Sequence, residues 1–287
     1  MKRATIMILA VILFMASLGL TFYPIISNCI NARYASQIQT SYEAVIAEAD
    51  NSELLAAREA AARYNESITP GTTMTDAYSQ EALLEASQNY EELLNIAGDS
   101  IMGCVEIPKI SVQLPIYHGT GADSLERGVG HLLGSSLPVG GGSTHTILTG
   151  HSGMATQKMF SDLPQLEVGD VFYLKVLGDT LAYQVDQIHT VLPHDTTYLG
   201  IEQNRDLCTL VTCTPFGVNT HRLLVRGTRI PYEEAETIVE TTQEKVVEST
   251  WEQHYLKGII IGLGMVLAAS IVGTVVWLIR GRCHEKH

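Results

Sequence analysis

Uncharged apolar residues are concentrated at the two ends of the chain, and amphipathic patterns fill the region between them. One run extends from Ala4 to Ile26 and a second from Gly258 to Ile279, neither with a charged residue. About 20 apolar residues cross a bilayer core as a helix, so each run predicts a transmembrane helix. A signal peptide has a shorter apolar region, although small residues around Met15–Gly19 keep a cleaved signal peptide as the alternative for the first run.

Basic residues flank both apolar runs on the side of the chain terminus. Lys2 and Arg3 precede the first run, and Arg280, Arg282 and Lys286 follow the second. Because Lys and Arg accumulate on the cytoplasmic side of membrane spans, we expect both termini to be cytoplasmic. The region between the two spans is then extracellular.

After the first span, the pattern favours helices. Residues 35–64 are rich in Ala, Glu and Leu and contain no Pro or Gly, as is typical of a helix. Residues 67–79 are dense in Thr, Ser, Gly and Pro, which indicates an exposed loop. Apolar residues at helical spacing from Leu83 to Ala97, with Ser79 as a cap and Gly98 as a stop, predict a second helix.

From Ile101 onward the pattern changes to short apolar or alternating stretches separated by turn residues. Several such stretches predict a β-barrel or sandwich rather than a parallel α/β sheet. Pro231 ends this region, and an acidic stretch of helical character follows it. The expected strands are Val105–Ile110, Leu114–Tyr117, Thr144–Thr149, Asp170–Val176, Thr180–Val191, Leu207–Cys213 and Arg222–Ile230.

These patterns divide the chain into consecutive segments. They are an N-terminal anchor (1–27), a helical segment that contains the loop (28–97), a β domain (98–232), an acidic helical stalk (233–257), a C-terminal transmembrane helix (258–279) and a basic tail (280–287).

The charge of the chain excludes one class of partner. The chain carries 18 basic and 31 acidic residues, a net charge of −13, whereas nucleic-acid binding needs a basic surface. The acidity comes mainly from the helical stretches, since residues 100–230 contain 11 acids and eight bases. It therefore indicates solvated helical faces and says little about a substrate.

The stretch TLVTCTPFGVNTHRLLVRG (209–227) carries the candidate chemistry. An apolar strand ends at Cys213, a Pro-Phe-Gly turn follows, and a second strand opens with Arg222. Antiparallel pairing across a short turn would bring Arg222 beside Cys213, where a guanidinium stabilises a thiolate or an oxyanion. The alternative is a buried structural cysteine, because free Cys is among the most buried residue types. Cys208 is about 17 Å away along the same strand, too far for a disulfide.

A cysteine nucleophile needs a base, and ILTGHSG (147–153) supplies the candidate. His151 follows an apolar strand and has a glycine close by on each side, whereas His145 and His221 are expected to form structural hydrogen bonds. A zinc site made of His145, His151 and Cys213 is the metal alternative. It is disfavoured because the two histidines would lie about 20 Å apart along one strand, against metal–ligand bonds of about 2 Å. We predict no metal and no other cofactor.

Together these motifs resemble the catalytic signature of the sortases. The resemblance is carried by TLVTC (209–213) with Arg222 and by TGH (149–151). The surrounding sequence is similar to the class C, or pilin-polymerising, sortases over residues 98–232, and two terminal membrane spans are also typical of that class. The similar stretches are MGCVEIPKI (102–110), LPIYHGT (114–120), GVGHLLGSSLPVGG (128–141) and TCTPFGVNTHRLLVRG (212–227).

The resemblance implies an eight-stranded sortase-type β-barrel, mainly β, with N-terminal helices and a transmembrane helix at each end. It implies a membrane-anchored cysteine transpeptidase that assembles pili on Gram-positive cells. Cys213 would attack the Thr–Gly carbonyl of an LPxTG-like sorting signal and form a thioacyl-enzyme, which a lysine amine of a pilin would resolve. His151 would protonate the leaving amine and deprotonate the incoming one, and Arg222 would position the signal or stabilise the oxyanion. In this family the active form is thought to be a minor thiolate–imidazolium pair.

Class C sortases also resemble one another in a lid, a loop with Asp-Pro followed by Phe or Trp that covers the active site. The loop at 67–79 contains Asp76 and Tyr78 without the proline. The resemblance implies that Asp76 pairs with Arg222 and that Tyr78 covers the sulfur of Cys213. The alternative is that Asp76 caps the following helix and Tyr78 packs on it.

Other functions stay open at this stage. They are a housekeeping sortase that attaches surface proteins to the cell wall, a surface cysteine protease that transfers the acyl group to water, and a non-enzymatic pilus or adhesion scaffold.

Overall fold

The computed structural model describes residues 2–68, 89–154, 156–242, 253, 255–266 and 268. The chain forms two compact units. One contains the two terminal segments, up to Tyr23 and from Glu248 onward, and the other contains Pro24–Val247. The second unit carries the barrel and the candidate site.

The N-terminal region is helical, as the sequence predicts, but it contains two helices. Helix α1 (Lys2–Glu48) includes the whole first apolar run, with Pro24 inside it. It is the helix in the described part of the chain that is long and apolar enough to cross a membrane. Helix α2 (Asn51–Ser67) begins after Asp50, whose carboxylate accepts a hydrogen bond from the Ser52 N–H at 3.4 Å. The predicted helix at 35–64 is therefore interrupted by an N-cap.

The C-terminal apolar run is described only at its beginning. Residues 255–266 form a helix that is apolar but shorter than a membrane span. The rest of the predicted span, to Ile279, lies outside the described residues. The two-span prediction is thus supported at the N-terminal end and stays a prediction at the C-terminal end.

The predicted α-helix from Leu83 to Ala97 is wrong where the structure describes it. Residues 89–97 form turns and the 3₁₀ helix η1 (Tyr90–Glu92), and the remainder lies outside the described residues. Tyr90 is buried, and its hydroxyl accepts a hydrogen bond from the Gly119 N–H at 3.0 Å. The same hydroxyl lies 2.7 Å from Nδ1 of His131. These contacts with the barrel override the helical periodicity of the segment.

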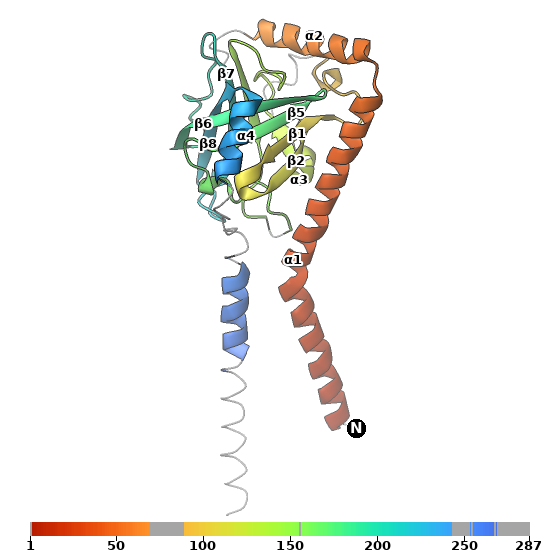
Figure 1. The fold of residues 1–287 in the computed structure, drawn as a ribbon. Helices are drawn as coiled ribbons and strands as arrows, with labels where there is room; N and C mark the ends of the chain where they lie inside the picture. The colour runs from red at the N-terminus through yellow and green to blue at the C-terminus, as the bar shows by residue number, and fades with distance from the viewer. Residues whose placement is uncertain are drawn as a thin grey trace, which may run out of the picture. The chain divides into compact units, whose positions relative to one another are not determined.

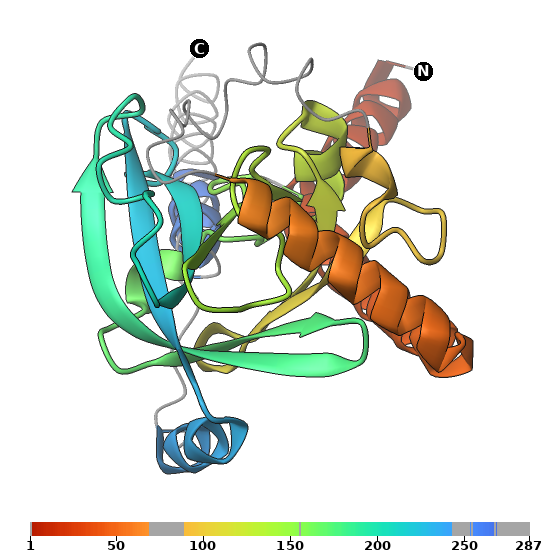
Figure 2. The same cartoon turned by 90° about the horizontal axis from the view of Figure 1, so that it is seen from above.

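Eight strands close into a barrel, which decides between the two predicted β architectures (Figure 1). The order around the barrel is β1-β2-β3-β4-β7-β8-β6-β5. Figure 2 shows the strands curving round a common interior. The strands are β1 (Ile101–Ile107), β2 (Val112–His118), β3 (Val129–His131), β4 (Thr144–Thr149), β5 (Val171–Val176), β6 (Asp179–Val191), β7 (Asp206–Thr214) and β8 (His221–Ile230).

The strand predictions differ from the structure mainly at the start of the domain. The expected strand Val105–Ile110 begins four residues earlier and ends at Ile107, because Pro108 lacks an N–H and opens the 3₁₀ helix η2 (Pro108–Ile110). Strand β3 was not predicted, since three residues show no usable alternation. Two further short helices, α3 (Ala122–Arg127) and η3 (Leu163–Gln165), lie in the connections.

Two strand pairs in the barrel are parallel, and one of them builds the candidate site. β3 pairs with β2, and β4 pairs with β7, in parallel; the other neighbours are antiparallel. In the β4–β7 pair, Thr144 lies opposite Asp206 and Thr149 opposite Val211. Strands that are more than 50 residues apart in the chain therefore run side by side and end at the same edge.

The barrel interior is filled by apolar and aromatic side chains. Phe172 and Tyr183 stack with their ring centroids 5.6 Å apart. Gly227 makes room for them, since a Cβ there would lie 2.6 Å from Cε1 of Phe172. Outside the barrel, helix α4 (Tyr232–Thr242) packs through Ala235 against β5 and β6. The expected helix after Pro231 is confirmed as far as residue 242, where the described part of that segment ends.

Candidate active site

Cys213 and Arg222 are direct cross-strand partners. They lie opposite each other where β7 and β8 meet in an antiparallel pair, so their Cα atoms are about 5 Å apart. Directly opposed residues in an antiparallel pair point to the same face of the sheet. The predicted pairing of the two strands is confirmed, and it brings the guanidinium and the thiol to one face.

His151 lies beyond the end of the strand on the other side of β7. The last ladder pair joins Thr149 and Val211. The backbones stay together for one more step, because the Gly150 N–H donates to the Val211 carbonyl at 3.0 Å. The Thr212 hydroxyl also donates to the Gly150 carbonyl at 2.7 Å. The ladder itself ends at Thr149; continuing its register by two residues would bring His151 level with Cys213, at a strand spacing of about 4.8 Å.

The outer face of the sheet is the side to which these residues belong. Leu148, Leu210 and Leu223 belong to the interior core cluster. Their sequence neighbours on the same three strands, Ile147, Val211 and Leu224, form a separate outer cluster. Side chains alternate along a strand, so Cys213 and Arg222 share the outer face with Val211 and Leu224. His151 follows Ile147 by four residues, so continued alternation would direct it to the same outer face. All three candidate residues are half-buried.

The connection between β6 and β7 is held beside this face. Its residue Leu199 completes the outer cluster. Arg226 of β8 forms an ion pair with Glu202, which is farther along the connection, at 2.5 Å. It forms a second ion pair with Asp186 of β6 at 2.7 Å. Arg205 pairs with both carboxylates. These ion pairs hold the connection against β6 and β8.

His145 has the structural role that the sequence suggested. It is buried, and its ring nitrogens lie 2.8 Å from the Gly200 carbonyl and 2.7 Å from the Thr209 hydroxyl. A carbonyl only accepts, so Nδ1 carries the proton and Nε2 accepts from Thr209. Burial lowers the pKa of His145 to about 4. Its neutral form ties the β6–β7 connection to strand β4.

Burial also lowers the pKa of His151 below its ordinary value, and the nearby Glu126 carboxylate partly opposes this effect. His151 is therefore neutral near pH 7, the form that accepts a proton. The other two cysteines of the barrel, Cys104 and Cys208, are buried, whereas Cys213 is half-buried. Burial raises the pKa of Cys104 to about 12 and that of Cys208 well above the ordinary value, and all three thiols are free.

The candidate lid residues Asp76 and Tyr78 lie outside the described residues. The predicted contact of Asp76 with Arg222 and the alternative cap thus both stay predictions. His221, which was expected to be structural, lies with Nδ1 2.9 Å from the Thr220 hydroxyl.

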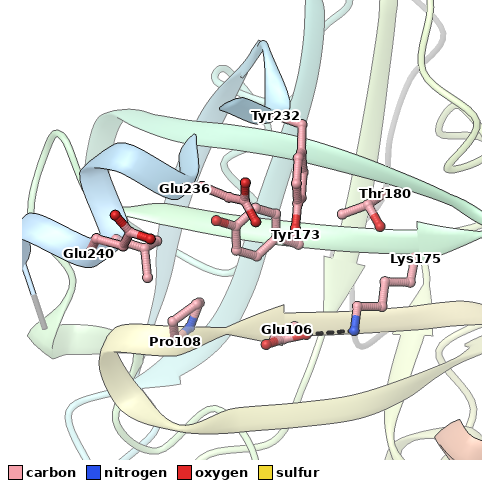
Figure 3. A pocket seen from close by; sticks show the side chains of 9 residues that line it. Glu106, Pro108, Tyr173, Lys175, Thr180, Tyr232, Glu236 and Glu240 are labelled. Carbon is pink, nitrogen blue, oxygen red and sulfur yellow. Dashed lines mark ion pairs between the residues drawn. The ribbon is translucent and has the colours of Figure 1, made fainter. Parts of the chain in front are cut away.

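A pocket of about 370 Å³ lies on another part of the barrel (Figure 3). An ion pair of 2.9 Å joins two of its lining residues, Glu106 of β1 and Lys175 of β5. The rings of Tyr173 and Tyr232 lie with their centroids 5.9 Å apart and their planes tilted by 51°. In the barrel order β1 is far from β7, and none of the predicted catalytic residues lines this pocket. The other lining residues are Pro108, Thr180, Glu236, Val239 and Glu240.

Comparison with known proteins assigns the family. The sortase domain model matches residues 105–230. Sortase C-1 from Actinomyces oris is 47% identical, with a TM-score of 0.58, and the match covers 62% of this chain and 99% of that structure. The chain belongs to the sortase family.

Other solved relatives are also class C sortases. Sortase C of Streptococcus pneumoniae is 41% identical over 68% of this chain and 97% of its own, with a TM-score of 0.63. Sortase C1 of Streptococcus agalactiae is 43% identical over 69% of this chain and 96% of its own, with a TM-score of 0.62. Among curated sequences, sortase D of Bacillus subtilis is 34% identical over 131 residues, which is 45% of this chain and 63% of that protein. This sortase thus spans just under two thirds of that relative's length.

Proposed function

We propose that this sortase is a membrane-anchored transpeptidase of the pilin-polymerising class. It cleaves an LPxTG-like sorting signal between Thr and Gly and transfers the acyl group to a lysine amine of a pilin subunit. The observation that carries the proposal is the position of Cys213, opposite Arg222 on β8 and two residues beyond Val211, where β7 pairs with the end of the strand that leads to His151.

The chemistry follows from this arrangement. The thiol of Cys213 transfers its proton to neutral His151 and attacks the Thr carbonyl, so that a C–S bond forms and the carbonyl oxygen becomes negative. Arg222 stabilises that oxyanion or holds the signal in place. Collapse of the intermediate breaks the Thr–Gly bond, and imidazolium at His151 protonates the leaving amine. The incoming lysine amine then loses a proton to His151 and displaces the sulfur, forming an isopeptide bond.

The choice of class rests on the relatives. One solved neighbour is described in terms of pilin substrate specificity and another as a pilus-related sortase C, at 41% and 39% identity. The relatives called sortase A are 23–27% identical. The higher identity supports pilus assembly over the housekeeping alternative.

The test is product analysis by mass spectrometry, using an LPxTG peptide with and without a lysine-bearing pilin acceptor. The proposal expects an isopeptide-linked product that depends on the acceptor lysine. Release of the free acid alone would support the hydrolase alternative, and no cleavage with any sorting signal would support the non-enzymatic scaffold.

The two-span topology leads to a separate expectation. A tag placed at either terminus should be protected from external protease in intact cells, because both termini are cytoplasmic. The measurement is immunoblotting of each tag before and after protease treatment, with detergent-lysed cells as the control. Cleavage of a C-terminal tag in intact cells would refute the second span.

The lid hypothesis also gives an expected result. An exposed ion pair contributes about 0–1 kcal/mol and an aromatic contact about 1 kcal/mol. A lid held by Asp76 and Tyr78 would then be closed by a factor of about 5 to 30. The double substitution Asp76→Ala and Tyr78→Ala should therefore raise the rate of Cys213 alkylation several-fold. Wild-type kinetics in this variant would mean that the loop does not cover the cysteine.

A further inference from the structure

The loop that follows His151, residues 152–162, is hydrogen-bonded to helix α1 close to the end of the apolar run of this helix. The side-chain amide of Asn31 donates to the Thr156 carbonyl at 3.1 Å. The Lys158 N–H donates to the Asn28 side-chain carbonyl at 2.8 Å. Both bonds end on backbone groups of the loop, so they set the path of the chain itself. Asn28 comes two residues after the uncharged run that ends at Ile26.

The same loop holds the backbone of His151. The Phe160 N–H, two residues after Lys158, donates to the His151 carbonyl at 3.0 Å. The Phe160 ring is fully buried and lies against Gly150, where an added Cβ would come within 2.7 Å of Cδ2. A displacement of the loop is therefore transmitted to the residue pair 150–151 through one hydrogen bond and one close packing contact.

Helix α1 also contacts the barrel closer to its C-terminal end. The Tyr42 hydroxyl donates to the Met102 carbonyl at 3.1 Å and accepts from the Leu177 N–H at 3.0 Å. Ala35, Tyr42 and Ile46 also belong to the main core cluster of the barrel. The helix is thus bound to the barrel at one point and to the loop at another.

Side chains of the loop make further bonds to the barrel. The Lys158 ammonium donates to the Ile110 carbonyl at 2.6 Å; its ion pair with Asp162 at 2.8 Å lies within the loop. The Gln157 amide donates to the Glu126 carbonyl at 2.6 Å. These bonds keep the loop near the barrel through flexible side chains, whereas the two asparagines engage its main chain. Loss of the asparagines should shift the loop without unfolding it.

We propose that Asn28 and Asn31 are positioning residues for His151, so that the helix which carries the membrane anchor also supports the catalytic loop. The inference rests on the proposed function of His151 as the acid and base. Asn28 acts as an acceptor and Asn31 as a donor, because their partners are an N–H and a carbonyl respectively. The two positions therefore respond differently to the same isosteric change.

The test compares Asn28→Asp with Asn31→Asp in the full chain in detergent, with turnover of an LPxTG peptide as the readout. Asp keeps the acceptor that the Lys158 N–H needs, so Asn28→Asp should retain a near-wild-type kcat. Asp cannot donate to the Thr156 carbonyl, so Asn31→Asp should lose activity. Displacing a catalytic group by about 1 Å costs up to about 100-fold. We expect kcat to fall about tenfold in Asn31→Asp and in Asn28→Ala with Asn31→Ala, while KM stays close to wild type.

Hydrogen exchange of the backbone amides gives a second readout that does not depend on turnover. Amides of residues 150–162 should exchange faster in the double alanine variant than in the wild type, while amides of β7 and β8 stay unchanged. Gln37→Ala, which removes an exposed amide from the same helix, is the matched control and should change neither readout.

Unchanged exchange in the double alanine variant would overturn the inference, even if no peptide is turned over. Equal losses of kcat in Asn28→Asp and Asn31→Asp would overturn it too, because the donor and acceptor roles would then be irrelevant. A wild-type chain that cleaves no sorting signal, with exchange changed as expected, would instead count against the proposed function and leave the mechanical link in place.

Discussion

Replacement of Cys213 by alanine is expected to lower cleavage of a sorting-signal peptide by at least about a thousandfold, since removal of a covalent nucleophile removes the reaction path itself. The variant should keep its fold, because Cys213 is only half-buried at the end of β7. The measurement is the initial rate of peptide cleavage, together with trapping of a thioacyl-enzyme by mass spectrometry.

Cys208 provides the matched control on the same strand. Its side chain belongs to the interior cluster, and Cys208→Ala should retain catalysis with some loss of stability.

Thiol labelling gives an independent comparison in a Cys29→Ser and Cys283→Ser background. A thiol reagent at pH 7.5 should modify Cys213 and spare Cys104 and Cys208, because burial raises the pKa values of both. Peptide cleavage by Cys213→Ala at the wild-type rate would show that another group is the nucleophile.

Acidification from pH 6.5 to pH 4 should remove a large part of the barrel's stability. Burial lowers the pKa of both His131 and His145 to about 4 in the folded protein, whereas the ordinary value is about 6.5. Above pH 6.5 both states are neutral and the histidines have no effect. As the pH falls to 4, the unfolded chain binds protons that the folded chain does not, and the free energy of unfolding decreases by about 3 kcal/mol per histidine.

Burial keeps both histidines neutral, and their hydrogen bonds are those of a neutral imidazole, with one ring nitrogen donating and the other accepting. Nε2 of His131 donates to the Ser136 carbonyl at 3.0 Å, and its Nδ1 accepts from Tyr90 at 2.7 Å.

Asp186 affects stability in a different pH range. Desolvation of this carboxylate is outweighed by its bonds to Arg226 and Arg205, which lower its pKa to about 2. Its contribution is therefore lost only as the pH falls below about 4.

The measurement is urea unfolding of the full chain in detergent, followed by tyrosine fluorescence between pH 4.5 and 7. His145→Gln keeps hydrogen-bonding capacity at this position and should remove about half of the decrease. His194→Gln removes an exposed imidazole instead and serves as the control. A midpoint that stays constant between pH 7 and 4.5 in the wild type would contradict the assignment of two buried neutral histidines.

Sequence patterns were most informative where neighbouring residues in the chain decide the structure. The N-terminal apolar run predicted the long helix α1, and alternation predicted most strands of the barrel within a few residues. The position of Arg222 beside Cys213 was also predictable. Six residues lie between β7 and β8, too few for the long crossover that a parallel pair needs, so the two strands pair antiparallel.

The position of His151 depends on tertiary structure. Its strand β4 runs parallel to β7, and a parallel pair needs a long crossover whose partner no local pattern specifies. In the sequence, only the resemblance to sortases connected the TGH motif with the TLVTC motif. The register of β4 and β7 gives the structural reason. Tyr90 is a similar case, because its bonds with Gly119 and His131 replaced the helix that its spacing predicted.

By itself, then, the sequence determined the apolar anchor, the β class of the domain and the cysteine–arginine hairpin. Each depends on interactions between residues close in the chain, which hydrophobic period and turn length report directly. Only the tertiary structure decided the closed barrel, the parallel pairing of β4 with β7 and the bonds from Asn28 and Asn31 to the loop at 152–162. The bonds of the two asparagines and the pairing of β4 with β7 join segments more than 50 residues apart, and no hydrophobic period or turn length specifies such partners.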